Sequence, residues 1–95
     1  MKAFFVAQLR IKSDEKFKEY SIKAAKTISD HGGEVLIRGS ILEHLNGEFP
    51  FNLIAIVTFP DATKLQRWFK SEEYQSLIPL RDEASDMLLT GFKAL

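Results

Sequence analysis

Residues 53–59, Leu-Ile-Ala-Ile-Val-Thr-Phe, form a nearly unbroken apolar run of the length of a β-strand. Side chains alternate between the two faces of a sheet, so a strand that is apolar at odd and even positions needs cover on both faces. Residues 3–11, Ala-Phe-Phe-Val-Ala-Gln-Leu-Arg-Ile, begin in the same way and alternate towards their end. Any fold of this chain must therefore cover both sides of a sheet that contains these two strands.

An amphipathic helix pattern follows the first strand. Ser13 provides an N-cap, and Asp14 and Glu15 come next, where the end of a helix is positive. Gly32-Gly33 ends the helix, because glycine readily takes the left-handed conformation of a C-cap. The expected inner stripe, spaced by three and four residues, consists of Phe17, Tyr20, Ala24, Ile28 and His31.

Two shorter helical segments follow the apolar strand. Asp61 caps the first segment and Ser71 caps the second. Pro79 either breaks the second segment or starts a further turn, because proline lacks the backbone N–H and fixes φ. The expected inner faces consist of Ala62, Leu65, Trp68 and Phe69 in the first segment and Tyr74, Leu77 and Ile78 in the second.

The other two strands are less regular. Residues 34–45 have the pattern of one strand interrupted at Gly39, where we favour a β-bulge over a tight hairpin. Asn46-Gly47 predicts a turn directly after this strand. Residues 87–92 provide the last strand.

The elements therefore follow one another as β-α-β-β-α-β. This order predicts an α+β, ferredoxin-like sandwich, with a four-stranded antiparallel sheet and helices on one face. The 95 residues have room for a single domain, 1–95. No further element is left to cover the second face of the sheet. The expected cover is another copy of the chain, so we predict a homodimer.

The composition argues against several classes of function. Thirteen Lys and Arg residues balance thirteen Asp and Glu residues, so no surplus of charge favours nucleic acid or a membrane surface. The absence of Cys excludes disulfides, thiolate metal sites and cysteine nucleophiles. No apolar run approaches the roughly 20 residues that span a bilayer, and the first residues lack the pattern of a signal peptide. We therefore expect a cytoplasmic protein.

The two histidines form no metal or catalytic pattern. His31 lies beside the helix stop, where a capping role is the simpler interpretation than a ligand role. Glu43 and His44, if both lie in the strand, point to opposite faces and form no acid–base pair. No spacing of His and carboxylates matches a known metal site, and no serine lies in a nucleophile elbow. The sequence thus predicts neither a metal nor another cofactor.

Polar side chains within apolar segments are the best candidates for a functional site. Arg38 lies in mid-strand, and Arg81 lies on the stripe of Tyr74 that should face the sheet. A buried cation needs an anionic partner. This partner is either a carboxylate of the same chain or an anionic ligand in a cleft between the helices and the sheet. The carboxylates that we consider are those of Glu43, Glu48 and Glu83.

Short motifs along essentially the whole chain resemble one known family. They are Met1-Lys2-Ala3-Phe4, Tyr20, Gly32-Gly33, Arg38-Gly39, Leu45-x-Gly47-Glu48, Phe59-Pro60, Trp68-x-x-Ser71-x-Glu73-Tyr74 and Leu80-Arg81. In this order and spacing they resemble the domain-of-unknown-function 1330 family. The resemblance implies a dimeric α/β barrel of ferredoxin-like protomers, in a superfamily with cofactor-free monooxygenases, lactone isomerases and haem proteins. It implies no particular activity, because none is assigned to the family.

Two functional hypotheses follow. In the first, the chain is a homodimer that binds a small anionic organic compound, and a cofactor-independent enzyme is one form of this hypothesis. In the second, it is a noncatalytic dimerisation or regulatory module in which buried Arg ion pairs are structural. The residues of the first hypothesis are Arg38 and Arg81 for the anion, Trp68 and Tyr74 for the apolar part, and Tyr20 or His44 for proton transfer.

Overall fold

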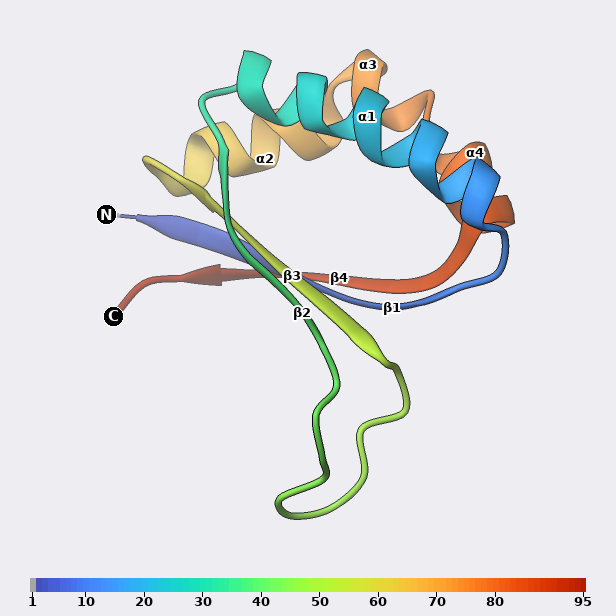
Figure 1. Ribbon diagram of the computed structural model, residues 1–95. Helices are drawn as coiled ribbons and strands as arrows, with labels where there is room; N and C mark the ends of the chain where they lie inside the picture. Colours follow the sequence, from blue (N-terminus) through green and yellow to red (C-terminus); the bar gives the residue numbers. More distant parts are fainter. Residues whose placement is uncertain (1) are drawn as a thin grey trace.

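The computed structural model describes residues 2–95 as a four-stranded antiparallel sheet with helices on one face (Figure 1). The strands are β1 (Ala3–Ile11), β2 (Glu34–Ser40), β3 (Leu53–Phe59) and β4 (Ser85–Lys93), and the helices are α1 (Asp14–Asp30), α2 (Ala62–Lys70), α3 (Glu72–Gln75) and α4 (Ile78–Ala84). The order in the sheet is β2-β3-β1-β4, so the two strands that are apolar on both faces lie at its centre. The predicted ferredoxin-like order of elements is confirmed.

The capping residues identified in the sequence set the ends of the helices. The side chains of Ser13 and Asp61 accept hydrogen bonds from backbone N–H groups in the first turns of α1 and α2. Gly32, directly after α1, has a φ of 81°, the left-handed conformation that favours glycine. Ser71 ends α2 and caps α3. Pro79 lies in the first turn of α4 and therefore starts a further helix.

The core lies between the helices and the sheet. β1 contributes every second residue from Ala3 to Leu9 to the core. The rings of Phe5 and Trp68 stack with centroids 4.8 Å apart, and the centroids of Trp68 and Tyr74 lie 4.3 Å apart. The predicted burial of Trp68 and Tyr74 is confirmed, whereas Phe69, expected on the same inner face, is 38% exposed. None of the helices within residues 2–95 is long and apolar enough to cross a membrane.

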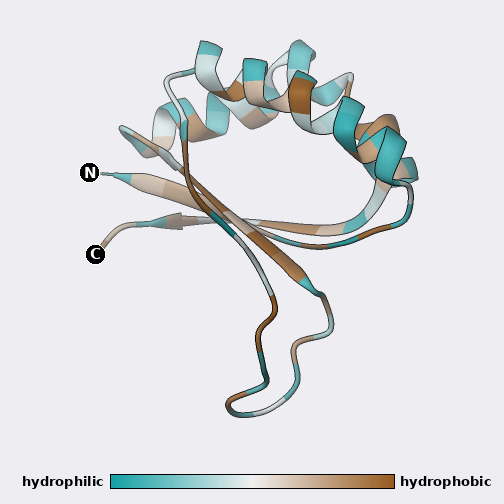
Figure 2. Ribbon diagram, in the orientation of Figure 1, coloured by the Kyte–Doolittle hydropathy of each residue, from teal (hydrophilic) through white to brown (hydrophobic). Residues whose placement is uncertain are grey.

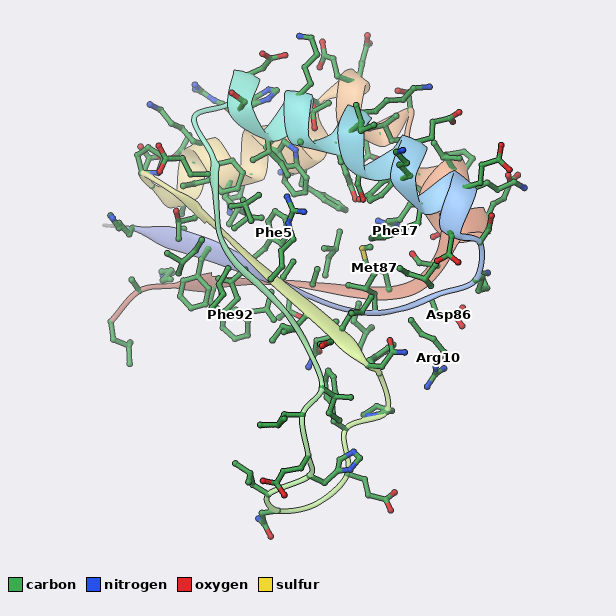
Figure 3. All side chains as sticks on the ribbon, in the orientation of Figure 1. Phe5, Arg10, Phe17, Asp86, Met87 and Phe92 are labelled. Carbon is green, nitrogen blue, oxygen red and sulfur yellow. The ribbon has the colours of Figure 1, made fainter. Side chains whose placement is uncertain are left out.

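The opposite face of the sheet carries no helix (Figure 1). We call it the free face. The rings of Phe4 and Phe92 stack across β1 and β4 with centroids 5.3 Å apart, and Leu88 on β4 is 53% exposed. Figure 3 shows Phe92 on this side of the sheet and Phe5 on the helix side. The strand register assigns Phe4, Val6, Ile37, Ile54, Ile56, Leu88 and Phe92 to the free face. The second apolar face predicted from the sequence is therefore present and uncovered.

The irregularity in β2 lies at a different residue from the one predicted. The register shifts between Val35 and Ile37, so the bulge is at Leu36. Gly39, where we expected the bulge, pairs regularly with Ile54. The prediction that the strand is interrupted at Gly39 was therefore wrong. The last strand, predicted over residues 87–92, is longer and extends over Ser85–Lys93.

Residues 41–52, which we call the arm, form a projecting loop rather than the second half of a strand (Figure 1). The last backbone hydrogen bond between its two sides joins Ile41 N–H to the carbonyl of Asn52 at 2.8 Å. Beyond this point Leu42 and Leu45 are 94% and 88% exposed. Figure 2 shows that apolar colouring continues from β2 into the arm, which explains why the sequence resembles a longer strand.

Candidate functional site

A cavity of about 130 Å³ lies between α1 and the helix-facing side of the sheet. We call it the interlayer cavity. Phe5, Phe17 and Met87, labelled in Figure 3, contribute to its mainly apolar wall. A dry apolar cavity of about 150 Å³ in another protein binds benzene. The interlayer cavity therefore has the size and character of a site for one small ring. Its side chains with polar groups are Tyr20, Ser21, Arg38 and Trp68.

Three side chains form a hydrogen-bonded row beside this cavity. The Oη atoms of Tyr20 and Tyr74 lie 2.8 Å apart, and Nη1 of Arg81 donates to Oη of Tyr74 at 3.3 Å. The three residues come from α1, α3 and α4, so the row connects three helices. Tyr74 is completely buried, and Tyr20 is the member of the row that lines the cavity.

The surroundings of this row fix its protonation. Burial raises the pKa of Tyr20 well above its usual value, and the neighbouring Tyr74 adds to this rise, while Arg81 offsets only part of it. Burial acts to lower the pKa of Arg81, but its hydrogen bonds to Tyr74 and Asp82 outweigh this effect and raise it. At neutral pH Tyr20 is therefore a neutral hydroxyl and Arg81 is a cation.

The carboxylate partner of Arg81 differs from those expected. Nε of Arg81 lies 3.2 Å from the carboxylate of Asp82, which is largely exposed. Glu83, the candidate nearest in sequence, lies 3.1 Å from Nζ of Lys16 instead. This occurs because α4 lies beside α1, so Lys16 is within reach of Glu83. Arg81 does not line the interlayer cavity, because its donors face Tyr74 and Asp82.

Arg38 lies on the helix-facing side of β2, opposite Ala55, and lines the interlayer cavity. Its expected burial was wrong: the residue is exposed, because β2 is an edge strand of the sheet. Within residues 2–95 its guanidinium forms no ion pair. Arg38 is thus an exposed cation at the rim of an apolar cavity.

His44 lies apart from the other candidate residues. It belongs to the arm, as does Glu43, so their predicted position in a strand was wrong. Both line a separate, open hollow of about 580 Å³, formed by the arm and the adjoining ends of β2 and β3. This hollow is larger than the interlayer cavity, but most of its walls are exposed loop residues, which offer a ligand little fixed structure.

Trp68 is held in place by a residue that the sequence analysis did not identify. Nε1 of Trp68 donates to Oγ1 of Thr27 at 2.9 Å, and this hydroxyl donates to the carbonyl of Ala24 at 2.8 Å. The signal in the sequence is a threonine next to Ile28 on the apolar stripe of α1. Ser21 and Met87 were also missed as lining residues, and nothing in their sequence context distinguishes them from ordinary surface and core residues.

The comparisons with known proteins address the fold. The family model described as a domain of unknown function, DUF1330, matches residues 2–93. A search of curated proteins finds no match. Among solved structures, a protein of unknown function from Rhodopseudomonas palustris is similar, with a TM-score of 0.83 and 17% identity over 99% of this chain and 82% of that chain.

Two further structures are similar at lower identity. SnoaB, a cofactor-independent oxygenase from Streptomyces nogalater, has a TM-score of 0.72 and 13% identity, over 99% of this chain and 93% of its own. A dimeric ferredoxin-like protein of unknown function from Thermobifida fusca has a TM-score of 0.66 and 9% identity, over 99% of this chain and 92% of its own. At these identities the similarity shows a shared ferredoxin-like fold.

Proposed function

The chain belongs to the DUF1330 family of domains of unknown function, and we propose that it is a homodimer that binds a small, mainly apolar organic anion in the interlayer cavity. The observation that carries the proposal is the combination of an apolar cavity with one exposed cation, Arg38, at its rim. An apolar body fills such a cavity, and a carboxylate takes charge-assisted hydrogen bonds from the guanidinium.

The homodimer is supported by the free face and by the arm. Leu88 and Phe92 on the free face are about half exposed, and Leu42 and Leu45 on the arm are almost fully exposed. Apolar surfaces of this kind favour association, and a second copy of the chain presents a surface of matching character. The Thermobifida fusca protein, described as dimeric, has the same fold.

We limit the proposal to binding, although SnoaB shows that this fold can carry a cofactor-independent oxygenase. The residues that line the interlayer cavity include no carboxylate and no histidine. Tyr20 is held in its neutral form and Arg38 is a cation, so neither acts as a base at neutral pH. The cavity can orient a ligand, but it lacks the ordinary residues for taking a proton from one.

Titrations with phenylacetate and the uncharged phenylacetamide, followed by amide chemical shifts, test this proposal. We expect phenylacetate to bind more tightly and to shift amides of α1 and β4 around the cavity. Arg38→Met should weaken phenylacetate about tenfold and leave phenylacetamide unchanged, because only the carboxylate uses the charge. Arg67→Met, at an exposed position of α2 outside the cavity, is the matched control. Equal binding of both compounds, or shifts confined to the arm, would contradict the proposal.

A further inference from the structure

The hydrogen-bonded row beside the cavity has a direction that follows from counting its protons. Arg81 has only donors, so Tyr74 accepts from it. Tyr74 is completely buried, and its own proton needs an acceptor. The bonded partner that can accept is Oη of Tyr20, 2.8 Å away. The opposite order would leave the proton of Tyr74 in the core without a partner, so the row runs from Arg81 through Tyr74 to Tyr20.

In this direction the hydroxyl proton of Tyr20 has no acceptor within the row. Within residues 2–95 the hydroxyl of Tyr20 has one hydrogen bond, the one in which it accepts from Tyr74. Tyr20 is 6% exposed and lines the interlayer cavity. Because Tyr20 lines the cavity, a ligand group bound there is the partner that we consider for its O–H. Because the row begins at a cation, each O–H along it is polarised, which strengthens the last donor.

We propose that Tyr20 donates this hydrogen bond to the ligand, and that the ligand carries an acceptor oxygen, such as that of a ketone, on the part that enters the cavity. This inference rests on the proposed function and adds a second recognition point to it. Arg38 would bind the charge at the rim, while Tyr20 would select an oxygen inside. Tyr74 and Arg81 act through Tyr20 and are positioning residues.

Acetophenone and ethylbenzene test the proposal, because they differ essentially in the carbonyl oxygen. We expect the parent protein to bind acetophenone at least fivefold more tightly than ethylbenzene in titrations followed by amide chemical shifts. In Tyr20→Phe the two affinities should agree within about twofold, because the ring remains and the donor is gone. Tyr74→Phe, which keeps the Tyr20 hydroxyl but separates it from Arg81, should retain part of the preference.

The infrared stretch of a ¹³C-labelled carbonyl in bound acetophenone reports the hydrogen bond to the ligand directly and separately from the affinity. In the parent protein this stretch should move to lower wavenumber than in hexane. The displacement should be smaller in Tyr74→Phe and in Arg81→Met, and absent in Tyr20→Phe. An undisplaced stretch in the parent protein would overturn the proposal by itself.

The possible failures are distinguishable. If acetophenone and ethylbenzene bind the cavity equally well in the parent protein, Tyr20 is not a donor to the ligand, and the proposed binding function stands. If neither compound binds and phenylacetate binds outside the interlayer cavity, this cavity is not the site. Both the proposed location and the inference about Tyr20 are then wrong. If none of the compounds binds, both proposals are overturned.

Discussion

Single polar atoms hold the aromatic core of this protein in a defined arrangement. Within residues 2–95 every fully buried side-chain nitrogen or oxygen has a hydrogen-bond partner. Trp68 and Tyr74 each depend on one side chain of α1, Thr27 and Tyr20 respectively. Removing such a partner leaves a buried polar group unpaired, which costs more free energy than the hydrogen bond itself contributes.

Thr27→Val tests this dependence at Trp68. Valine keeps the shape of threonine but offers no acceptor to Nε1 of Trp68, so we expect the free energy of unfolding to fall by about 1–3 kcal/mol. Thr27→Ser keeps the hydroxyl and should lose less. Denaturant titrations followed by the fluorescence of the single tryptophan measure both variants. A valine variant as stable as the serine variant would show that the hydrogen bond between Trp68 and Thr27 does not contribute to stability.

Tyr20 predicts a specific dependence of stability on alkaline pH. Its pKa is raised in the folded protein, so the unfolded chain releases this proton first, near its ordinary pKa of about 10. Above that pH the free energy of the unfolded state falls relative to that of the folded state, so the free energy of unfolding decreases. One such proton accounts for at most about 1.4 kcal/mol per pH unit.

We expect Tyr20→Phe to remove this contribution. Urea unfolding at pH 8 to 11 should show a steeper loss of stability for the parent protein than for the variant above pH 10, and parallel curves below pH 9. Because the lysines are the same in both proteins, the difference isolates the tyrosine. Parallel curves over the whole range would indicate that the hydroxyl of Tyr20 is not shielded from water.

At the residue scale, the sequence predicts positions better than partners. The spacing on α1 and α2 correctly assigned Tyr20 and Trp68 to the core, because helical periodicity alone determines the inner face. Arg81 does pair with a carboxylate of the same chain, but the candidates Glu43, Glu48 and Glu83 were wrong, because Asp82 is the partner and Glu83 pairs with Lys16 where α4 lies against α1. Such a relation between distant elements has no local signal in the sequence.

At the scale of elements, the junction between α1 and β2 is set by two glycines with different roles. Gly32 supplies the left-handed conformation that ends the helix. Gly33 supplies space, since a Cβ there would lie 2.6 Å from Cγ2 of Ile28 and 2.7 Å from Cε1 of Phe59. The Gly-Gly pair was predicted as a helix stop, but the close packing at Gly33 is visible only in the structure.

Gly33→Ala should therefore destabilise the protein by about 1–3 kcal/mol, the usual cost of overpacking a core. Gly39→Ala, within the edge strand β2, is the control, because its Cβ would meet only Cγ2 of Ile54 at 3.5 Å, an ordinary contact. Thermal unfolding of the two variants compares them directly. Equal melting temperatures would mean that Ile28 and Phe59 move aside at little cost.

The main error at this scale was the arm. Ile41, Leu42 and Leu45 continue the apolar pattern of β2, and the pattern alone predicts a strand. Pairing stops because β3 begins at Leu53, so the chain lacks a neighbouring strand beyond Ile41. Apolar residues thus occur here without a partner in the same chain, which periodicity cannot distinguish from a buried strand.

At the scale of the whole molecule, the protein exposes more surface than a monomer of its size. A folded monomer of 10.9 kDa is expected to expose roughly 5,600 Å². This chain exposes 6576 Å². The excess of roughly 1,000 Å² is close to the ~800 Å² that each partner buries in a standard protein–protein interface. The excess, the free face and the arm all support the homodimer proposed above.

Leu88→Glu tests this association, because it places a charge among the apolar side chains of the free face, on the edge strand β4, where Leu88 is 53% exposed. Burying an unpaired carboxylate at an interface is strongly unfavourable, so the variant should be monomeric at micromolar concentration. Light scattering should give about twice the 10.9 kDa chain mass for the parent protein and the chain mass for the variant. The tryptophan fluorescence should stay the same in both, because Leu88 points away from Trp68 and the core.

Ile22→Glu is the matched control, since Ile22 is also exposed, at 65%, but lies on the outer side of α1. This variant should remain a dimer if association uses the sheet, and it should dissociate if association uses the helices. A parent protein that is monomeric at tens of micromolar would contradict the homodimer altogether. A dimeric Leu88→Glu would instead move the interface away from the free face, and the exposed leucines of the arm would become the next positions to substitute.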